Sequence, residues 1–262
     1  MQPDERSKRP EGRTDFERAF TAGATFAAPD DGPLLVQQVC AGDLILPSGQ
    51  LIACDPCYLH WPMDVAAFTR TVPPGRYPVW MALARPVGEE PHFARVACAL
   101  VRFADVPVAR WTMALRPDED PAALRFGHFY GYGVDSGTSC FVDAAAVAAL
   151  NADETEALFR DRVIGAFERD SWETRWANVR PRDHGDANLI AFSSGYGDGA
   201  YPSWWGLDAA GDVCALATDF HVLVEHLERK AQFPVRSWAG RTIEHPDLSR
   251  IGITARLLSV AR

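Results

Sequence analysis

Short apolar segments, rich in β-branched and aromatic residues and separated by Gly, Pro and Asp, recur along most of this 262-residue chain. Segments of this kind are typical of β-strands. They follow one another without a helix between each pair, so a parallel doubly wound sheet is not expected. Within residues 43–54, Pro47-Ser48-Gly49 has the chemistry of a hairpin turn. The predicted strands cover residues 34–39, 43–54, 76–84, 92–103, 109–115, 188–192, 201–206 and 213–220.

Helices are predicted at only a few places between these strands. Asp64 would cap a helix that begins near residue 63 and reaches Phe68, and Asp143 would cap a short helix after a strand. Residues 154–170 carry apolar side chains at helical spacing. The predicted fold class is therefore α+β, mainly an antiparallel β-sheet arranged as a sandwich or barrel, with a few inserted helices.

The N-terminal part of the chain differs in composition from the rest. Residues 1–33 are charged and Pro-rich, and we expect a poorly ordered arm with one helical turn near residues 15–20. Residues 34–262 are expected to form a single β-rich domain.

Charge and hydropathy limit the classes of partner. The formal net charge is −9, and a general nucleic-acid binder needs a basic surface, so no nucleic-acid partner is expected. The chain has no apolar run long enough to cross a membrane, and its first residues lack the apolar core of a signal peptide. A soluble, cytoplasmic protein whose six cysteines stay reduced is expected.

The sequence CDPC places Cys54 and Cys57 at a spacing that suits a metal or a redox pair. A structural zinc site needs two more ligands, and neither a second CxxC nor an HxxxH is present. A thioredoxin-like motif would open a helix, whereas this one ends a strand. Two small residues flanking an Asp-Pro turn are the favoured interpretation.

The segment YGYGVDSGTSCFVD, residues 130–143, places Asp135 between glycine-containing turns and follows it with hydroxyl side chains. Such a loop could present amide hydrogens and hydroxyls to an anion, or offer Asp135 as a base. Ser136 and Thr138 are the predicted substrate-binding hydroxyls. An Asx turn without any function is an equal alternative for Asp135, and Cys140 is expected in the core rather than as a nucleophile.

Residues 195–199 hold three glycines around Tyr196 and Asp198. Glycines at this density let the backbone approach a ligand or another strand closely. Aromatic rings next to a carboxylate are common in pockets for flat or sugar-like ligands, so Tyr201 and Trp204 are predicted as pocket walls. The alternative is a hairpin with a crowded turn.

Four aspartates each end a predicted strand: Asp55, Asp135, Asp198 and Asp219. If they converge on one rim, they would either coordinate a divalent cation or divide into a general acid and base. Asp135 and Asp198 are the predicted catalytic pair, and Asp55 and Asp219 the predicted metal ligands. No cofactor is identified beyond that cation. Alternatively, some of these carboxylates pair with Arg95 or Arg102, which lie among apolar strand residues.

Several short motifs occur in a recognisable order. Asp55-Pro56 after an apolar strand is followed by residues 75–79, 134–138 and 195–201, and by Asp219-Phe220. The series resembles a bacterial family known as domain of unknown function 4241, over roughly residues 34–224. The resemblance implies a soluble single-domain protein and supplies no activity, and the cysteines of CDPC depart from the family pattern.

Two functions from different classes are compatible with these residues, and the first is favoured, because glycine-rich loops that carry lone aspartates beside aromatic residues suit a concave site better than a flat contact surface. The first is an enzyme acting on a small polar molecule by hydrolase-type acid/base chemistry in a pocket lined by aspartates and walled by aromatic rings. The second is a non-enzymatic binding or immunity-type module whose acidic surface covers a protein partner. The enzyme requires that Asp135 and Asp198 face one concave pocket, whereas the binding module requires an exposed acidic surface.

Overall fold

The computed structural model describes residues 13–27, 32–61, 65–124, 128–148, 150–169, 175–181 and 186–223, and the backbone of three short strands beyond them. Residues 1–12 of the predicted arm and 244–262 of the predicted domain lie outside the described residues. In the part that is described, no helix is long and apolar enough to cross a bilayer.

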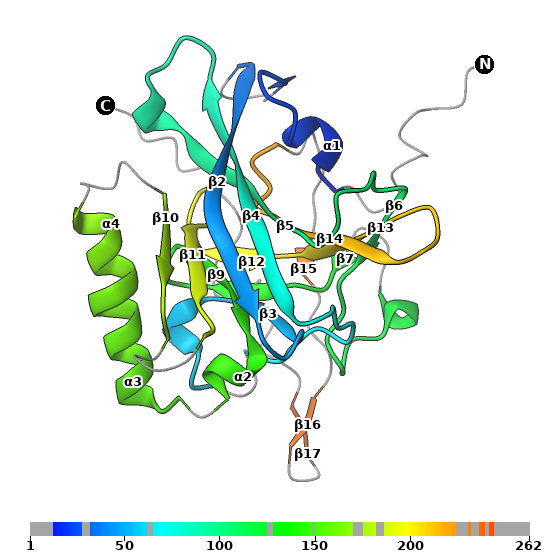
Figure 1. Cartoon of the computed structure of the whole chain (residues 1–262), viewed down its shortest axis with the longest axis vertical. Helices are drawn as coiled ribbons and strands as arrows, with labels where there is room; N and C mark the ends of the chain where they lie inside the picture. Colours follow the sequence, from blue (N-terminus) through cyan, green and yellow to red (C-terminus); the bar gives the residue numbers. More distant parts are fainter. Residues whose placement is uncertain are drawn as a thin grey trace.

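A seven-stranded sheet forms the larger part of the fold, and every neighbouring pair in it is antiparallel. The two longest strands, β2 and β4, lie side by side through the middle of the molecule (Figure 1). In spatial order the strands are β1 (Thr25–Phe26), β2 (Leu34–Leu46), β4 (Gly75–Pro86), β5 (Arg95–Arg102), β14 (Val213–Asp219), β13 (Ser203–Leu207) and β6 (Arg110–Met113).

A second, four-stranded sheet is also antiparallel throughout. Its strands are β10 (Trp176–Val179), β11 (Leu189–Ser193), β9 (Thr138–Asp143) and β3 (Leu51–Cys54). Three two-stranded pairs complete the β-structure: β8 (Tyr132–Val134) with β12 (Gly199–Tyr201), β7 (His128–Phe129) with β15 (Lys230–Ala231), and β16 (Arg236–Trp238) with β17 (Arg241–Ile243). Only β7 and β15 are parallel among the described pairs. The predicted α+β class with a mainly antiparallel sheet is confirmed.

α2 and the helical segment at residues 152–169 cover one side of the four-stranded sheet (Figure 1). Asp143 caps α2 (Ala144–Val147), as predicted. The helix predicted at 154–170 is a continuous segment made of α3 (Ala152–Ala157), the π-helical η5 (Leu158–Ile164) and α4 (Gly165–Arg169). It begins earlier than predicted because Asn151 and Glu154 form a capping box. Its buried Leu158, Val163 and Phe167 pack into the smaller of two apolar clusters.

The predicted hairpin around Pro47-Ser48-Gly49 is wrong, although the chain does turn there. β2 pairs with β4, whereas β3 joins the other sheet beside β9. Ser48 is held by Asp143, which accepts from its amide and its hydroxyl. Gly49 has φ +73°, and a Cβ there would lie 2.0 Å from the Val72 carbonyl oxygen. This glycine therefore lets residue 72 approach, and the turn carries the chain from one sheet to the other.

The predicted helix at residues 63–68 is also wrong where it can be assessed, since residues 65–68 are not helical and 62–64 lie outside the described residues. The Phe68 amide donates to the Leu51 carbonyl, and the Phe68 ring is buried against Trp205. Burial of the ring beside β3 outweighs a local capping signal.

Residues 13–27, which lie within the arm expected to be poorly ordered, are folded. Asp15 caps α1 (Phe16–Ala19), which confirms the predicted helical turn, and β1 pairs with β2. Phe16 is 1% exposed, and its ring lies 4.7 Å from that of Trp111. Trp111 Nε1 also donates to the Glu17 carboxylate at 2.6 Å. The buried Phe16 ring is one of the contacts that hold this segment against the sheet.

Candidate functional site

Asp135 and Asp198, the predicted catalytic pair, lie at the same end of a short ladder. Gly199 of β12 pairs with Val134 of β8, and each aspartate is the next residue beyond that pair. The loops behind them also meet, because the Ser194 amide donates to the Gly137 carbonyl at 3.1 Å. Both aspartates are exposed. The fold therefore brings these two carboxylates to neighbouring positions, on a surface.

Asp55 is a buried clamp beneath this surface. It is 1% exposed, and each carboxylate oxygen accepts two hydrogen bonds. Oδ2 accepts from the amides of Asp135 and Ser136 at 3.0 and 2.8 Å. Oδ1 accepts from the Ser136 hydroxyl at 2.7 Å and from the Cys57 amide at 2.8 Å. Asp55 thus joins the end of β3 to the Asp135 loop, and the predicted substrate-binding hydroxyl of Ser136 belongs to this clamp.

Tyr58 reaches Asp135 from the 3-10 helix η2 (Pro56–Tyr58) that follows Asp55. Its hydroxyl donates to Asp135 Oδ2 at 3.1 Å. Partial burial, and then the charge and hydrogen bond of Asp135, raise the pKa of Tyr58 to about 12. Ionised Tyr58 would place a second negative charge beside that carboxylate and lose the donated hydrogen.

We expect Asp135→Asn to lower the pKa of Tyr58 from about 12, because the repulsion and the charged acceptor are removed while the burial remains. The pKa of the folded form is raised, so this contact stabilises the fold below about pH 10, the ordinary tyrosine pKa, and the stabilisation is lost as the pH rises toward 12. The measurement is a tyrosinate absorbance titration, with Tyr58→Phe identifying the signal. An unchanged midpoint in Asp135→Asn would refute the contact.

The glycine-rich loop at residues 195–199 is shaped by its own contacts. The Tyr201 hydroxyl donates toward the Gly197 and Ser194 carbonyls, at 2.7 and 3.2 Å, and the Ser194 hydroxyl donates to Gly197 at 2.8 Å. Gly195 has φ +56°, and a Cβ there would lie 2.9 Å from Val222 Cγ2. The glycines therefore allow the chain to approach a neighbouring segment, and Tyr201 locks the turn from inside.

Three of the predicted binding residues lie in the interior. Thr138 is 2% exposed, and its hydroxyl donates to the Ser136 carbonyl at 3.4 Å. Trp204 is 0% exposed and belongs to the larger apolar cluster. Tyr201, at 5% exposed, packs its ring on Phe220. The aromatic wall predicted for a pocket is part of the core.

Asp219 makes its contacts with the N-terminal segment. It is 0% exposed, accepts from the Thr14 amide and hydroxyl at 2.8 and 3.0 Å, and accepts from the His221 amide at 2.9 Å. Arg95 lies over the Tyr196 ring at 4.8 Å, and Arg102 donates to the Val106 carbonyl at 3.4 Å. Among the described residues, neither arginine forms an ion pair with one of the four aspartates.

The metal role predicted for Asp55 and Asp219 gains no support from this geometry. Both carboxylates are occupied by amide and hydroxyl donors, which leaves no room for a cation at the same lone pairs. Across the described ranges, no group of three or more His, Cys, Asp and Glu side chains is arranged to hold a metal ion.

The two cysteines of CDPC are free thiols in different surroundings, since Cys54 is buried and Cys57 is partly exposed. Cys54 Sγ lies 3.8 Å from Cys140 Sγ, its partner across the β3–β9 pair, and both are buried. Burial raises the pKa of the Cys57 thiol, with Asp55 adding to the effect, and burial raises the pKa of Cys140. Thiolates are disfavoured at these positions, which supports the structural interpretation of the motif.

The sequence reasoning missed the exposed aromatic residues beside the aspartates. Trp61 is 53% exposed, and its ring lies 5.7 Å from that of Tyr58. Tyr196, 51% exposed, is two residues from Asp198. The run CYLHW directly after Asp55-Pro56 was the available signal. We call Tyr58, Trp61, Asp135, Tyr196 and Asp198 the acidic–aromatic surface.

The two best-formed clefts among the described residues are not lined by Asp135 or Asp198. One, of about 440 Å³, lies between β6, β13 and the segment at residues 69–70. The other, of about 420 Å³, lies between β3 and α2 and is mostly apolar. The hypothesis of acid/base catalysis requires both carboxylates to face one concave pocket. Neither of these two clefts meets that requirement.

Comparison with known proteins gives one match. A family described as "Protein of unknown function (DUF4241)" matches residues 44–218, which is most of the chain. No curated protein and no solved structure matches. The match covers Asp55, the Asp135 loop and the glycine-rich loop, and it supplies no activity.

Proposed function

The chain belongs to the DUF4241 family, and because that family comes without an activity, we propose from its surface that it is a non-enzymatic binding module. Its partner would be a basic protein, received on the acidic–aromatic surface. The observation that carries the proposal is the exposed position of Asp135 and Asp198 at the end of one ladder.

The composition of this surface supports a protein partner. Exposed aromatic rings are enriched in protein interfaces, where they bury much area at little entropic cost. Trp61 and Tyr196 are more than half exposed. Carboxylates beside them would attract a positively charged partner and set its orientation. The net charge of −9 favours encounter with such a partner over long distances.

The rigidity of the two loops also suits binding. Three hydrogen bonds to Asp55 fix the Asp135 loop, and Tyr201 fixes the other loop. Preorganised loops lose little entropy when a partner binds. A hydrolase using Asp135 and Asp198 has weaker support, because open carboxylates lack the water-excluding walls that make acid/base groups effective.

We expect the double charge reversal Asp135→Lys/Asp198→Lys to weaken capture of basic proteins by about tenfold or more. The tagged protein is used as bait in a pull-down from a lysate of the cells in which it naturally occurs. The bound proteins are quantified by mass spectrometry at several salt concentrations. Asp105→Lys/Asp212→Lys is the matched control, since it makes the same charge change at two exposed carboxylates outside the acidic–aromatic surface. Asp212 directly precedes the first residue of β14. Equal capture by both double variants would overturn the proposal, and so would retained proteins that are not basic.

A further inference from the structure

The cleft of about 440 Å³ contains polar atoms that the protein leaves unused. It is lined by Thr69, Arg70, Thr112, Met113, Leu115, Pro121, Leu124 and Trp205. Trp205 is 1% exposed, and neither its Nε1 nor the buried Thr112 Oγ1 has a hydrogen-bond partner among the described residues. Buried polar groups are almost always paired, and the exceptions call for an explanation.

The two side chains that carry these unpaired atoms come from neighbouring strands. Trp205 of β13 and Thr112 of β6 are directly opposite in the antiparallel ladder. Opposite residues of such a pair point to the same face of the sheet. The indole ring is held by Phe68 and Phe103, at centroid distances of 5.8 and 6.0 Å. The Trp205 indole and the Thr112 side chain are therefore held on the same face of the sheet.

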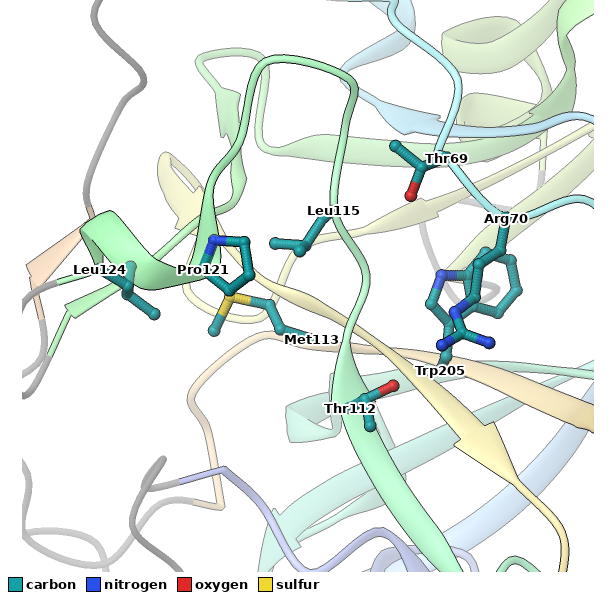
Figure 2. Close-up of a pocket in the computed structure, with 8 residues that line it drawn as sticks. All are labelled: Thr69, Arg70, Thr112, Met113, Leu115, Pro121, Leu124 and Trp205. Carbon is teal, nitrogen blue, oxygen red and sulfur yellow. The ribbon is translucent and has the colours of Figure 1, made fainter. Parts of the chain in front are cut away.

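Arg70 adds a positive charge at the same cleft. Its side chain is exposed, and none of the hydrogen bonds and ion pairs found among the described residues involves it. Figure 2 shows Thr69, Arg70, Thr112 and Trp205 on one side of the cleft. Met113, Pro121 and Leu124 lie on the other side, with Leu115 between them. None of the described residues that line the cleft carries a carboxylate.

The walls are fixed by hydrogen bonds that do not use the cleft-facing groups. The Thr69 amide donates to the Leu115 carbonyl at 2.8 Å, which ties the Arg70 segment to the chain after β6. The Tyr130 hydroxyl donates to the Asp120 carbonyl at 2.8 Å, which holds the 3-10 helix η4 (Pro121–Ala123). The cleft is therefore formed before any ligand arrives, as is usual for small-molecule sites.

We propose that this cleft binds a small organic carboxylate with an apolar body. The carboxylate would accept from Trp205 Nε1, Thr112 Oγ1 and the Arg70 guanidinium, three donors of the kind that such an anion needs. The apolar body would lie on Met113, Leu115, Pro121 and Leu124. The site is separate from the acidic–aromatic surface, and the inference does not depend on the function proposed for that surface.

The test follows indole N–H resonances of the whole chain by NMR while phenylacetate is added. Trp205→Phe assigns the Trp205 signal, which is expected to move as its N–H gains an acceptor. Trp204 provides an internal control, because its Nε1 is also buried and unpartnered but does not line the cleft. The neutral analogue phenylacetamide and inorganic phosphate are the comparison probes.

Affinity measured by calorimetry is expected to fall about tenfold in Arg70→Met and about fivefold in Thr112→Val. Arg110→Met, an exposed arginine of β6 outside the cleft, should leave it unchanged. Three outcomes would each overturn the proposal: no movement of the Trp205 signal at millimolar phenylacetate, equal binding of phenylacetamide or phosphate, or unchanged affinity in Arg70→Met and Thr112→Val. The first would mean that water alone satisfies these groups.

Discussion

Asp55→Asn is expected to lower the free energy of unfolding by about 3 kcal/mol, although the two side chains have the same shape. Each oxygen of Asp55 accepts two hydrogen bonds, three of the four from backbone amides that cannot reverse their direction. The asparagine amide group replaces one of these oxygens with a donor. Its hydrogens would then face the N–H groups of Asp135 and Ser136, or that of Cys57, inside a site that is 1% exposed.

The measurement is urea unfolding, supported by a thermal melt in which the midpoint should fall by roughly 10 °C for a chain of this size. Asp105→Asn is the matched control, since it makes the same chemical change at an exposed carboxylate. A loss below about 0.5 kcal/mol, the range of ordinary surface substitutions, would show that the clamp does not stabilise the fold. It would also remove the argument that the Asp135 loop is preorganised.

How much of this fold could be predicted from the sequence depends on the range of each interaction. Alternation and composition identify strands locally, and most of the predicted strands are present. Pairing is decided far along the chain. Nothing near Pro47-Ser48-Gly49 shows that β3 leaves β2 for β9, because the contact that holds the turn comes from Asp143. The folded segment at residues 13–27 was missed for the same reason, since Phe16 is buried by the distant Trp111.

The candidate site shows the same division. Asp135 and Asp198 were selected as a pair, and the β8–β12 ladder does place them at neighbouring positions. Asp55 and Asp219 also lie at strand ends, but their carboxylates point inward and accept from backbone amides. The position of an aspartate at a strand end does not show whether its side chain points into the protein or out to solvent. Trp204 was predicted as a pocket wall, whereas Trp205 lines a cleft. Adjacent strand residues face opposite sides of a sheet, and only the tertiary structure shows which side is hollow.

Asp219→Asn is expected to release the N-terminal segment from the large sheet. Asp219 Oδ2 accepts from the Thr14 amide, and Oδ1 accepts from both the Thr14 hydroxyl and the His221 amide. Loss of a charged acceptor for buried donors is expected to cost about 2 kcal/mol. Asp219 lies on β14 in the middle of the sheet, whereas Thr14 leads into α1 and the edge strand β1, so the segment with fewer contacts should open first.

Hydrogen–deuterium exchange measures this directly. Amides of residues 14–26 should lose protection in Asp219→Asn, while β4 and β5 keep theirs. Thr14→Val is a graded control, because it removes the hydroxyl donor and keeps the amide, so its effect should be smaller. Asp219→Asn also affects residue 221. Among the described non-glycine residues, His221 is the one with a left-handed backbone, at φ 58°, and its amide donates to Asp219. If residues 14–26 stay protected in Asp219→Asn, the aromatic contact between Phe16 and Trp111 holds the segment without the carboxylate. If β14 exchanges as fast as α1, the carboxylate stabilises the sheet itself, and the segment opens only with the whole fold.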